Sequence, residues 1–136
     1  MSYLLDSNCW IALLRWQNAS VLTRLKQCPA EDILLCSVVL AELWYGAERS
    51  DVSRRVNNYA LVDGLEAKYS TLSFDNRAAR EYALIRAHLS ATGQVIGPND
   101  MLIAAIARSH GATLVTNNVA EFSRVPGLLI DDWQTP

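Results

Sequence analysis

The chain has 136 residues, the length of one domain, so we expect a single domain over residues 1–136. Hydrophobic residues make up 51% of it and charged residues 19%, a composition that excludes disordered and fibrous proteins. Twelve basic and fourteen acidic residues give a net charge of −2, which excludes a generally basic nucleic-acid coat protein but leaves room for a local basic rim.

The first half of the chain alternates short apolar segments with helical ones. Residues 3–5 predict a short strand, and residues 6–8 supply capping side chains for a helix that follows. Residues 33–36, with the sequence Ile-Leu-Leu-Cys, are typical of a fully buried strand. We expect Ser37 to cap a helix from Val38 to about Arg49, and residues 50–51 to open another towards Leu65.

The second half predicts two more helices and two more strands. Asp75 is expected to cap a long amphipathic helix through Ala91 that is closed by Gly93. Residues 97–100 place a proline at the first position of a helix that runs to His110 and stops at Gly111. Strands are expected over 113–116 and 128–130. Strands that alternate with helices in short units predict an α/β fold with a mainly parallel sheet flanked by helices.

Acidic residues stand where such a sheet binds ligands, beyond the carboxyl ends of its strands. Asp6 follows the first strand, Glu42 lies in the helix after the second, and Asp100 is in the first turn of a later helix. Thr116 and residues 117–118 follow the third strand. Crowded carboxylates repel unless a cation neutralises them, and oxygen ligands without His or Cys favour Mg²⁺ or Mn²⁺ over zinc.

Each of these residues also has a purely structural interpretation. Asp6 can be a helix cap, Asp100 can complement a helix dipole, Glu42 can be an exposed helical side chain, and the Asn pair can be a turn. Spacing alone therefore predicts a plausible metal site and leaves these alternatives open.

Cysteine usage and hydropathy bound the remaining classes. Cys9, Cys28 and Cys36 form no Cys-x-x-Cys pair, so neither a disulfide framework nor a zinc site is predicted. The first six residues carry no basic n-region, and no apolar run approaches the roughly 18 residues that a membrane span needs. We expect a cytoplasmic protein with no membrane partner.

Four segments in register resemble the PIN-domain nucleases. Residues 4–8, Leu-Leu-Asp-Ser-Asn, resemble the opening motif of that family, and residues 37–43, followed by Gly46, resemble its Ser-x-x-x-x-Glu segment. Residues 97–105 are similar to its central Asp-x-x-Ile-Ala-x-Ala helix, and 116–118 with Phe122 to its closing segment. Size and tail are most similar to the VapC-type toxins of bacterial toxin–antitoxin pairs.

The resemblance implies a Rossmann-like PIN fold and a Mg²⁺-dependent endoribonuclease, with Mn²⁺ as a substitute ion. Asp6, Glu42 and Asp100 would be the metal-binding acids, Asn118 a weaker fourth catalytic member, and Ser7 and Thr116 supporting residues. Because Asn118 carries no charge where the family's acidic pattern has an acid, a second tightly held metal is in doubt. Hydrolysis would leave 5′-phosphate and 3′-hydroxyl ends, and the target RNA, a tRNA among others, stays open.

The same resemblance implies a VapB-type antitoxin that neutralises the toxin, a homodimer, and a higher oligomer with the antitoxin. Large apolar side chains available for an interface or for the core are Trp10, Trp16, Trp44 and Tyr45. Candidates for a cationic rim that attracts RNA are Arg15, Arg49, Arg86 and Arg124.

Other functions are weighed against this one. A nucleotide-binding Rossmann module lacks its glycine-rich phosphate loop, and a receiver-like domain would have a Lys where Asn117 follows Thr116. A DNA-binding or protein-binding module would need a basic or apolar patch that the composition does not reveal. The main alternative is an inactive PIN domain that acts as an RNA- or protein-binding module; such a domain would be expected to have lost one of the three acids, and all three are present.

Overall fold

A computed structural model describes all 136 residues of the chain. Five short strands form one sheet: β1 (Tyr3–Leu5), β2 (Ile33–Cys36), β3 (Ser70–Leu72), β4 (Thr113–Val115) and β5 (Leu129–Asp131). The helices are α1 (Ser7–Trp16), α2 (Ala19–Gln27), α3 (Ser37–Glu48), α4 (Val52–Lys68), α5 (Asn76–Ala91), α6 (Pro98–Ser109) and α7 (Val119–Phe122), with a 3₁₀ turn, η1, over Ala30–Asp32.

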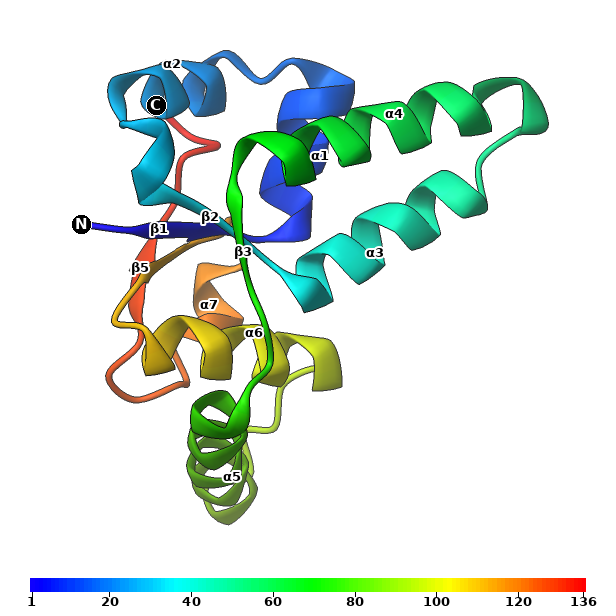
Figure 1. Ribbon diagram of the computed structural model, residues 1–136. Coiled ribbons are helices and arrows are strands. Elements are labelled where there is room, and N and C mark those ends of the chain that lie inside the picture. Colours follow the sequence, from blue (N-terminus) through cyan, green and yellow to red (C-terminus); the bar gives the residue numbers. More distant parts are fainter.

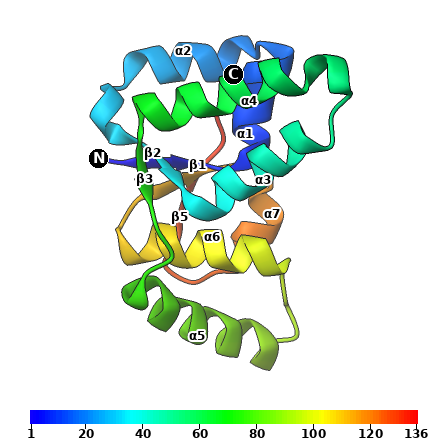
Figure 2. The same cartoon turned by 45° about the vertical axis from the view of Figure 1, so that its right-hand side comes forward.

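The sheet has the strand order β3-β2-β1-β4-β5, and every neighbouring pair is parallel. Helices α1 to α4 cover one face, and α5 and α6 cover the other (Figures 1 and 2). Both connections that lead outward from β1 to β3 therefore use one face, while the connection back to β4 uses the opposite face. The predicted α/β class with a parallel, helix-flanked sheet is confirmed.

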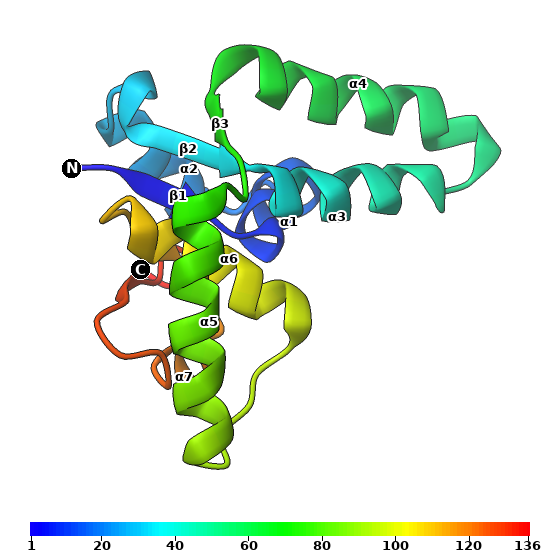
Figure 3. The same cartoon turned by 60° about the horizontal axis from the view of Figure 1, so that its bottom comes forward.

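Helix α3 and helix α4 run antiparallel and extend together away from the sheet (Figure 3). Helix α3 contacts α4, α1 and α6, so its first turns are held in the body of the fold. A contiguous core of 31 buried residues lies between the sheet and both helical layers. No helix combines the length and the apolar character that crossing a membrane requires.

Several predicted boundaries are confirmed, and they rest on capping chemistry. The carboxylates of Asp6 and Asp75 accept hydrogen bonds from the backbone N–H groups of Cys9 and Ala78, at 2.9 and 3.0 Å. Pro98 occupies the start of α6, and Gly111 beyond its end has a φ of +63°, which favours glycine.

Other expectations need correction. Ser37 does not cap α3: it is the first helical residue, Cys36 stands at the cap, and no side chain caps that end. The sheet has five strands instead of the predicted four, because β3 is an edge strand with exposed polar residues and no alternating pattern. Helix α2 was not predicted, because it is only nine residues long, mostly polar, and has Val21 as its only buried residue.

The strand order predicts unequal costs for two leucines in adjacent strands. We expect Leu114→Ala, fully buried in the inner strand β4, to lower the free energy of unfolding by about 2–5 kcal/mol because it leaves a cavity. The control Leu129→Ala, on edge strand β5 and 52% exposed, should cost under about 1 kcal/mol. Urea unfolding followed by circular dichroism measures both, and equal losses would contradict this sheet order.

Candidate active site

The candidate site lies where the strand order reverses. Strands β1 and β4 are neighbours, but the helices that follow β1 and those that precede β4 lie on opposite faces. Asp6 follows β1 and Thr116 follows β4, and the Asp6 N–H donates to the Val115 carbonyl at 3.0 Å. Such a switch point leaves a crevice at the carboxyl ends of the strands, so local sequence and topology place Asp6 in it.

Asp6 is a buried acid, only 5% exposed, and it is also the N-cap of α1. Burial raises its pKa, while hydrogen bonds with the Thr116 side chain and from the Cys9 N–H act in the lowering direction. The charge of Glu42 raises that pKa further, which shows that the two carboxylates share one electrostatic environment. The structural and the functional interpretation of Asp6 are therefore compatible.

Glu42 faces the site from the second turn of α3. Its carboxylate oxygen Oε1 accepts a hydrogen bond from the Ser7 hydroxyl at 3.1 Å. Since Ser7 begins α1 directly after Asp6, this bond ties the two acidic elements together. The expectation that Ser7 lies beside the acids is met by this contact.

Asp100, in the first turn of α6, is an acid with a strongly raised pKa. Burial raises its pKa to about 7, and Glu121, Glu42 and Asp6 all act in the same direction. Its hydrogen bond with Glu121 favours the protonated form of Asp100 and the charged form of Glu121. Three sequence-predicted acids thus converge from β1, α3 and α6.

Glu121 is a fourth acid that sequence reasoning missed. The Gly97 N–H donates to its Oε1 at 3.0 Å, and the Asn118 amide donates to its Oε2 at 2.7 Å. These two bonds lower its pKa, so Glu121 carries the charge in the pair with Asp100. A signal was present, because Asn118 is the N-cap of α7 and Glu121 stands three residues later, the spacing of a capping box.

Asn118 lies in the site, but its observed contacts are those of a positioning residue. Its backbone N–H donates to Thr116 Oγ1 at 3.0 Å, and its side chain holds Glu121. Thr116 is 1% exposed and bonds both Asp6 and Asn118. Asn118, predicted as an uncharged and weaker fourth member, thus holds a negatively charged neighbour, Glu121, three residues later.

The donor set fits a hard divalent cation in its chemistry. All the groups are oxygen donors, and no Lys or Arg forms an ion pair with Asp6, Glu42, Asp100 or Glu121. In this structure no three or more Asp, Glu, His or Cys side chains are grouped closely enough to hold one metal ion together. Mg²⁺ does not require such a group, since it keeps several waters and is held by one or two carboxylates in many sites.

A small polar hollow of about 230 Å³ opens between Glu42 and residues 97–100, with no hydrophobic side chain in its lining. A Cβ on Gly97 would lie 3.3 Å from Asp100 Oδ2, so this glycine leaves room for the carboxylate. The hollow gives solvent access to the acids.

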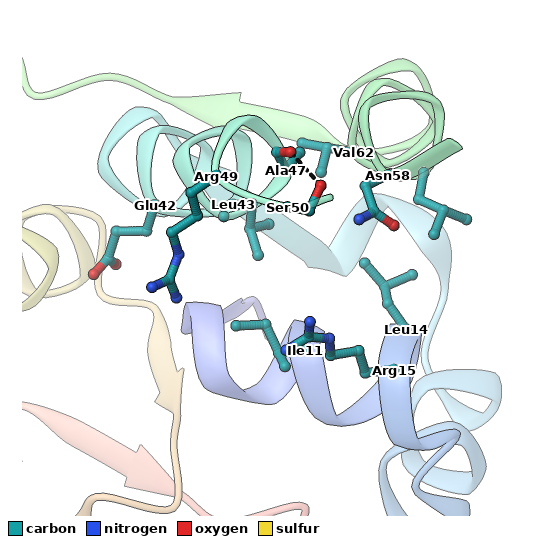
Figure 4. Close-up of a pocket in the computed structure, with 12 residues that line it drawn as sticks. Ile11, Leu14, Arg15, Glu42, Leu43, Ala47, Arg49, Ser50, Asn58 and Val62 are labelled. Carbon is teal, nitrogen blue, oxygen red and sulfur yellow. Dashed lines mark hydrogen bonds between the residues drawn. The ribbon is translucent and has the colours of Figure 1, made fainter. Parts of the chain in front are cut away.

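The four predicted rim arginines are not equally placed. Arg15 and Arg49 line a larger cavity that also contains Glu42 (Figure 4). Arg124 lowers the pKa of Glu121 through its charge, so it lies close to the acids. Arg86 lies on α5 and donates to the Tyr82 hydroxyl at 2.9 Å, on the other side of the sheet from α1 and α3.

The aromatic candidates divide in the same way between core and surface. Trp10 is fully buried, Trp44 is half-buried and donates to Asp63 at 3.1 Å, and Trp16 and Tyr45 are exposed. The three cysteines are free, with Cys9 and Cys36 buried in the core and Cys28 half-buried.

Comparison with known proteins places this geometry in a family. The PIN domain family model matches residues 3–128. The chain is 39% identical over 133 residues to the tRNA(fMet)-specific endonuclease VapC of Shigella flexneri, a match that covers 98% of both chains. It is 37% identical to Ribonuclease VapC2 of Haemophilus influenzae, with the same coverage.

Solved structures agree with the sequence matches. The VapBC complex of Salmonella typhimurium, bound to DNA, contains a chain that is 35% identical, with a TM-score of 0.91 and 98% of both chains covered. VapBC2 of Rickettsia felis, bound to a DNA fragment from its promoter, contains one that is 33% identical, with a TM-score of 0.89 and coverage of 98% of this chain and 99% of that one. The likeness in sequence, fold and acidic crevice extends over nearly the whole chain, which therefore belongs to the PIN-domain family and, within it, to the VapC ribonucleases.

Proposed function

We propose that this protein is a divalent-metal-dependent endoribonuclease that hydrolyses RNA phosphodiester bonds at the acidic crevice, with Mg²⁺ as its ion and Mn²⁺ as a substitute. The observation that carries the proposal is Asp100, whose pKa is raised to about 7 by burial and by three neighbouring acids with no cationic side chain paired to it. Such a cluster has unfavourable self-repulsion that a bound cation would relieve.

Asp6, Glu42 and Asp100 would hold the metal, and Glu121 would add charge beside Asp100. A bound Mg²⁺ lowers the pKa of a coordinated water and stabilises negative charge on the leaving oxygen. The chain itself orients the ligands: the Cys9 N–H holds Asp6, the Ser7 hydroxyl holds Glu42, and Asn118 with the Gly97 N–H holds Glu121. Hydrogen-bonded ligands of this kind are fixed before the cation arrives.

Two partners follow from the relatives. The VapBC complexes support a VapB-type antitoxin that neutralises this chain and forms a higher oligomer with it, and the named relative from Shigella flexneri supports a tRNA as substrate. The exposed Trp16 and Tyr45 supply apolar area for such contacts or for a homodimer. The first test is cleavage of total bacterial RNA with and without Mg²⁺ or Mn²⁺, with cut sites mapped by sequencing and initiator tRNA compared with elongator tRNA.

Asp100→Asn should abolish metal-dependent cleavage while leaving the fold intact, because it removes a charge and almost no volume. The control Asp51→Asn changes an exposed aspartate at the start of α4 that makes no side-chain cap bond, and it should cleave like the unmodified protein. Cleavage is measured on the mapped RNA, and folding by circular dichroism. Full Mg²⁺-dependent activity in Asp100→Asn would rule out the ligand role. A folded, metal-binding protein that cuts no RNA would instead favour the inactive, binding-module alternative.

Stability without metal should fall as the pH rises. The folded pKa of Asp100 lies near 7, above its ordinary value of 3.8, so the folded state binds more protons between those values. The stabilisation is complete below about pH 4 and is lost as the pH passes 7. Melting temperatures in EDTA at pH 5 and pH 8 measure this loss of stability. In Asp100→Asn the difference between the two melting temperatures should be smaller. Added Mg²⁺ should restore stability at pH 8. An equal pH response in the variant would contradict the assignment to Asp100.

Glu121→Gln should weaken cleavage by about 10- to 100-fold, the usual effect of removing a group that supports metal ligands. The loss should shrink as the Mg²⁺ concentration is raised, because the missing charge lowers the affinity for the cation. Glu66→Gln, an exposed glutamate on α4, is the matched control. The initial rate of cleavage is measured over a range of Mg²⁺ concentrations. A Mg²⁺ dependence equal to that of the unmodified protein would exclude Glu121 from the site.

A further inference from the structure

A second cavity lies beside the acidic crevice, between α1 and the α3–α4 hairpin. Its volume is about 410 Å³, within the roughly 300–1,000 Å³ of small-molecule sites. Its apolar walls come from three helices and consist of Ile11, Leu14, Leu43, Ala47, Leu61 and Val62. Glu42 lines both this cavity and the hollow at Asp100, so the cavity adjoins the site at which RNA would be cut.

Two arginines stand at this cavity without an acidic partner. Arg15 extends from α1 and Arg49 from the end of α3, and in Figure 4 the Arg49 guanidinium lies between Glu42 and Ile11. Neither forms an ion pair with a carboxylate, whereas Arg24 and Arg108 do. Arg49 also lies over the Tyr45 ring, 5.6 Å from its centroid. Two free cations beside an acidic site are placed to hold the phosphates of a chain that enters it.

Gly46 keeps the cavity open from within α3. A glycine inside a helix costs stability relative to alanine, so its presence calls for a reason. Close packing does not require a glycine here, because a Cβ at Gly46 would meet no atom within 4 Å. Gly46 lines the cavity, and any larger side chain would project from α3 into space that is otherwise empty. Gly46, the glycine that follows the Ser-x-x-x-x-Glu segment, therefore keeps this part of the cavity empty.

We propose that this cavity binds one unstacked nucleoside of the RNA substrate next to the scissile phosphate, and so sets a base preference at that position. The inference rests on the proposed function and adds a specificity site to it. The apolar walls take the faces of the base, Asn58 and Ser50 offer hydrogen-bonding groups to its edge, and Arg15 and Arg49 contact the flanking phosphates. Single-stranded RNA is read in this way, by splayed bases on apolar or guanidinium surfaces.

Charge favours a nucleoside over an apolar peptide side chain as the occupant. The protein has a net charge of −2 and a crevice of four acids, so RNA reaches the crevice only where local cations offset the repulsion. The two unpaired arginines provide that offset at this cavity. An apolar peptide would leave both guanidinium groups without an anionic partner.

The decisive variant is Gly46→Leu, which fills much of the cavity, with Gly46→Ala as the matched control that makes the same change in backbone propensity and adds only one methyl group. Each variant is given a randomised single-stranded oligoribonucleotide pool with Mg²⁺, and the cut ends are sequenced. We expect the unmodified protein and Gly46→Ala to share a base preference at one position beside the cut, and Gly46→Leu to lose it at that position only. Identical preferences in all three proteins would overturn the proposal and leave the nuclease assignment standing.

A binding measurement separates this proposal from the proposed function. In the Asp100→Asn background, Gly46→Leu should weaken binding of the same fluorescent pool at least tenfold, and Gly46→Ala should not. Arg15→Gln and Arg49→Gln should each reduce the slope of log Kd against log salt by roughly 0.7, the single-strand value per phosphate contact, with Arg80→Gln on α5 as control. If the unmodified protein cleaves nothing, the proposed function fails and binding alone still tests the cavity. If Gly46→Leu binds RNA normally and loses only a co-expressed antitoxin, the occupant is a peptide and the proposal is wrong.

Discussion

Repulsion between carboxylates is the constraint on which this structure depends. Asp6, Glu42, Asp100 and Glu121 meet at one edge of the sheet, and the charges of Asp6, Glu42 and Glu121 all raise the pKa of Asp100. The fold tolerates this because directed N–H and O–H groups from Cys9, Ser7, Gly97 and Asn118 point at three of the acids. The fourth, Asp100, is held towards its protonated form by its hydrogen bond with Glu121. The proposed cation would relieve the repulsion among these acids.

Residues at helix N-termini also line the acidic crevice. Asp6 caps α1 with its side chain, Asn118 stands at the N-cap position of α7 without a side-chain cap bond, and Asp100 lies in the first turn of α6. A helix N-terminus favours acidic side chains through its dipole and unsatisfied N–H groups, so the sheet-to-helix junctions can hold acids at little cost. At Asp6, for example, one carboxylate caps a helix and also lies among the proposed metal ligands, so the two roles are compatible.

Acidic and basic side chains occupy different places around the crevice. The acids occupy the switch point, while the unpaired cations Arg15 and Arg49 stand over the neighbouring cavity between α1 and the α3–α4 hairpin. The hairpin extends beyond the sheet (Figure 3), and its residues Leu43, Ala47, Leu61 and Val62 form one wall of the cavity. The proposed cation site and the cavity both involve α1 and α3, but among the four acids only Glu42 lines the cavity.

The sequence alone determined the α/β class, the strand at Ile33–Cys36, a strand at 113–116 that the structure ends at Val115, and the caps Asp6 and Asp75, because apolar periodicity and capping chemistry are local properties. It also placed Asp6, Glu42 and Asp100 near the carboxyl ends of the strands, where the structure brings them together. It missed β3 and α2, which are short and bury few residues, and it missed Glu121. Only the tertiary structure decided the strand order, the pairing of Glu121 with Asp100, and the cavity beside Arg49. These depend on contacts between residues far apart in the chain, which no local pattern encodes.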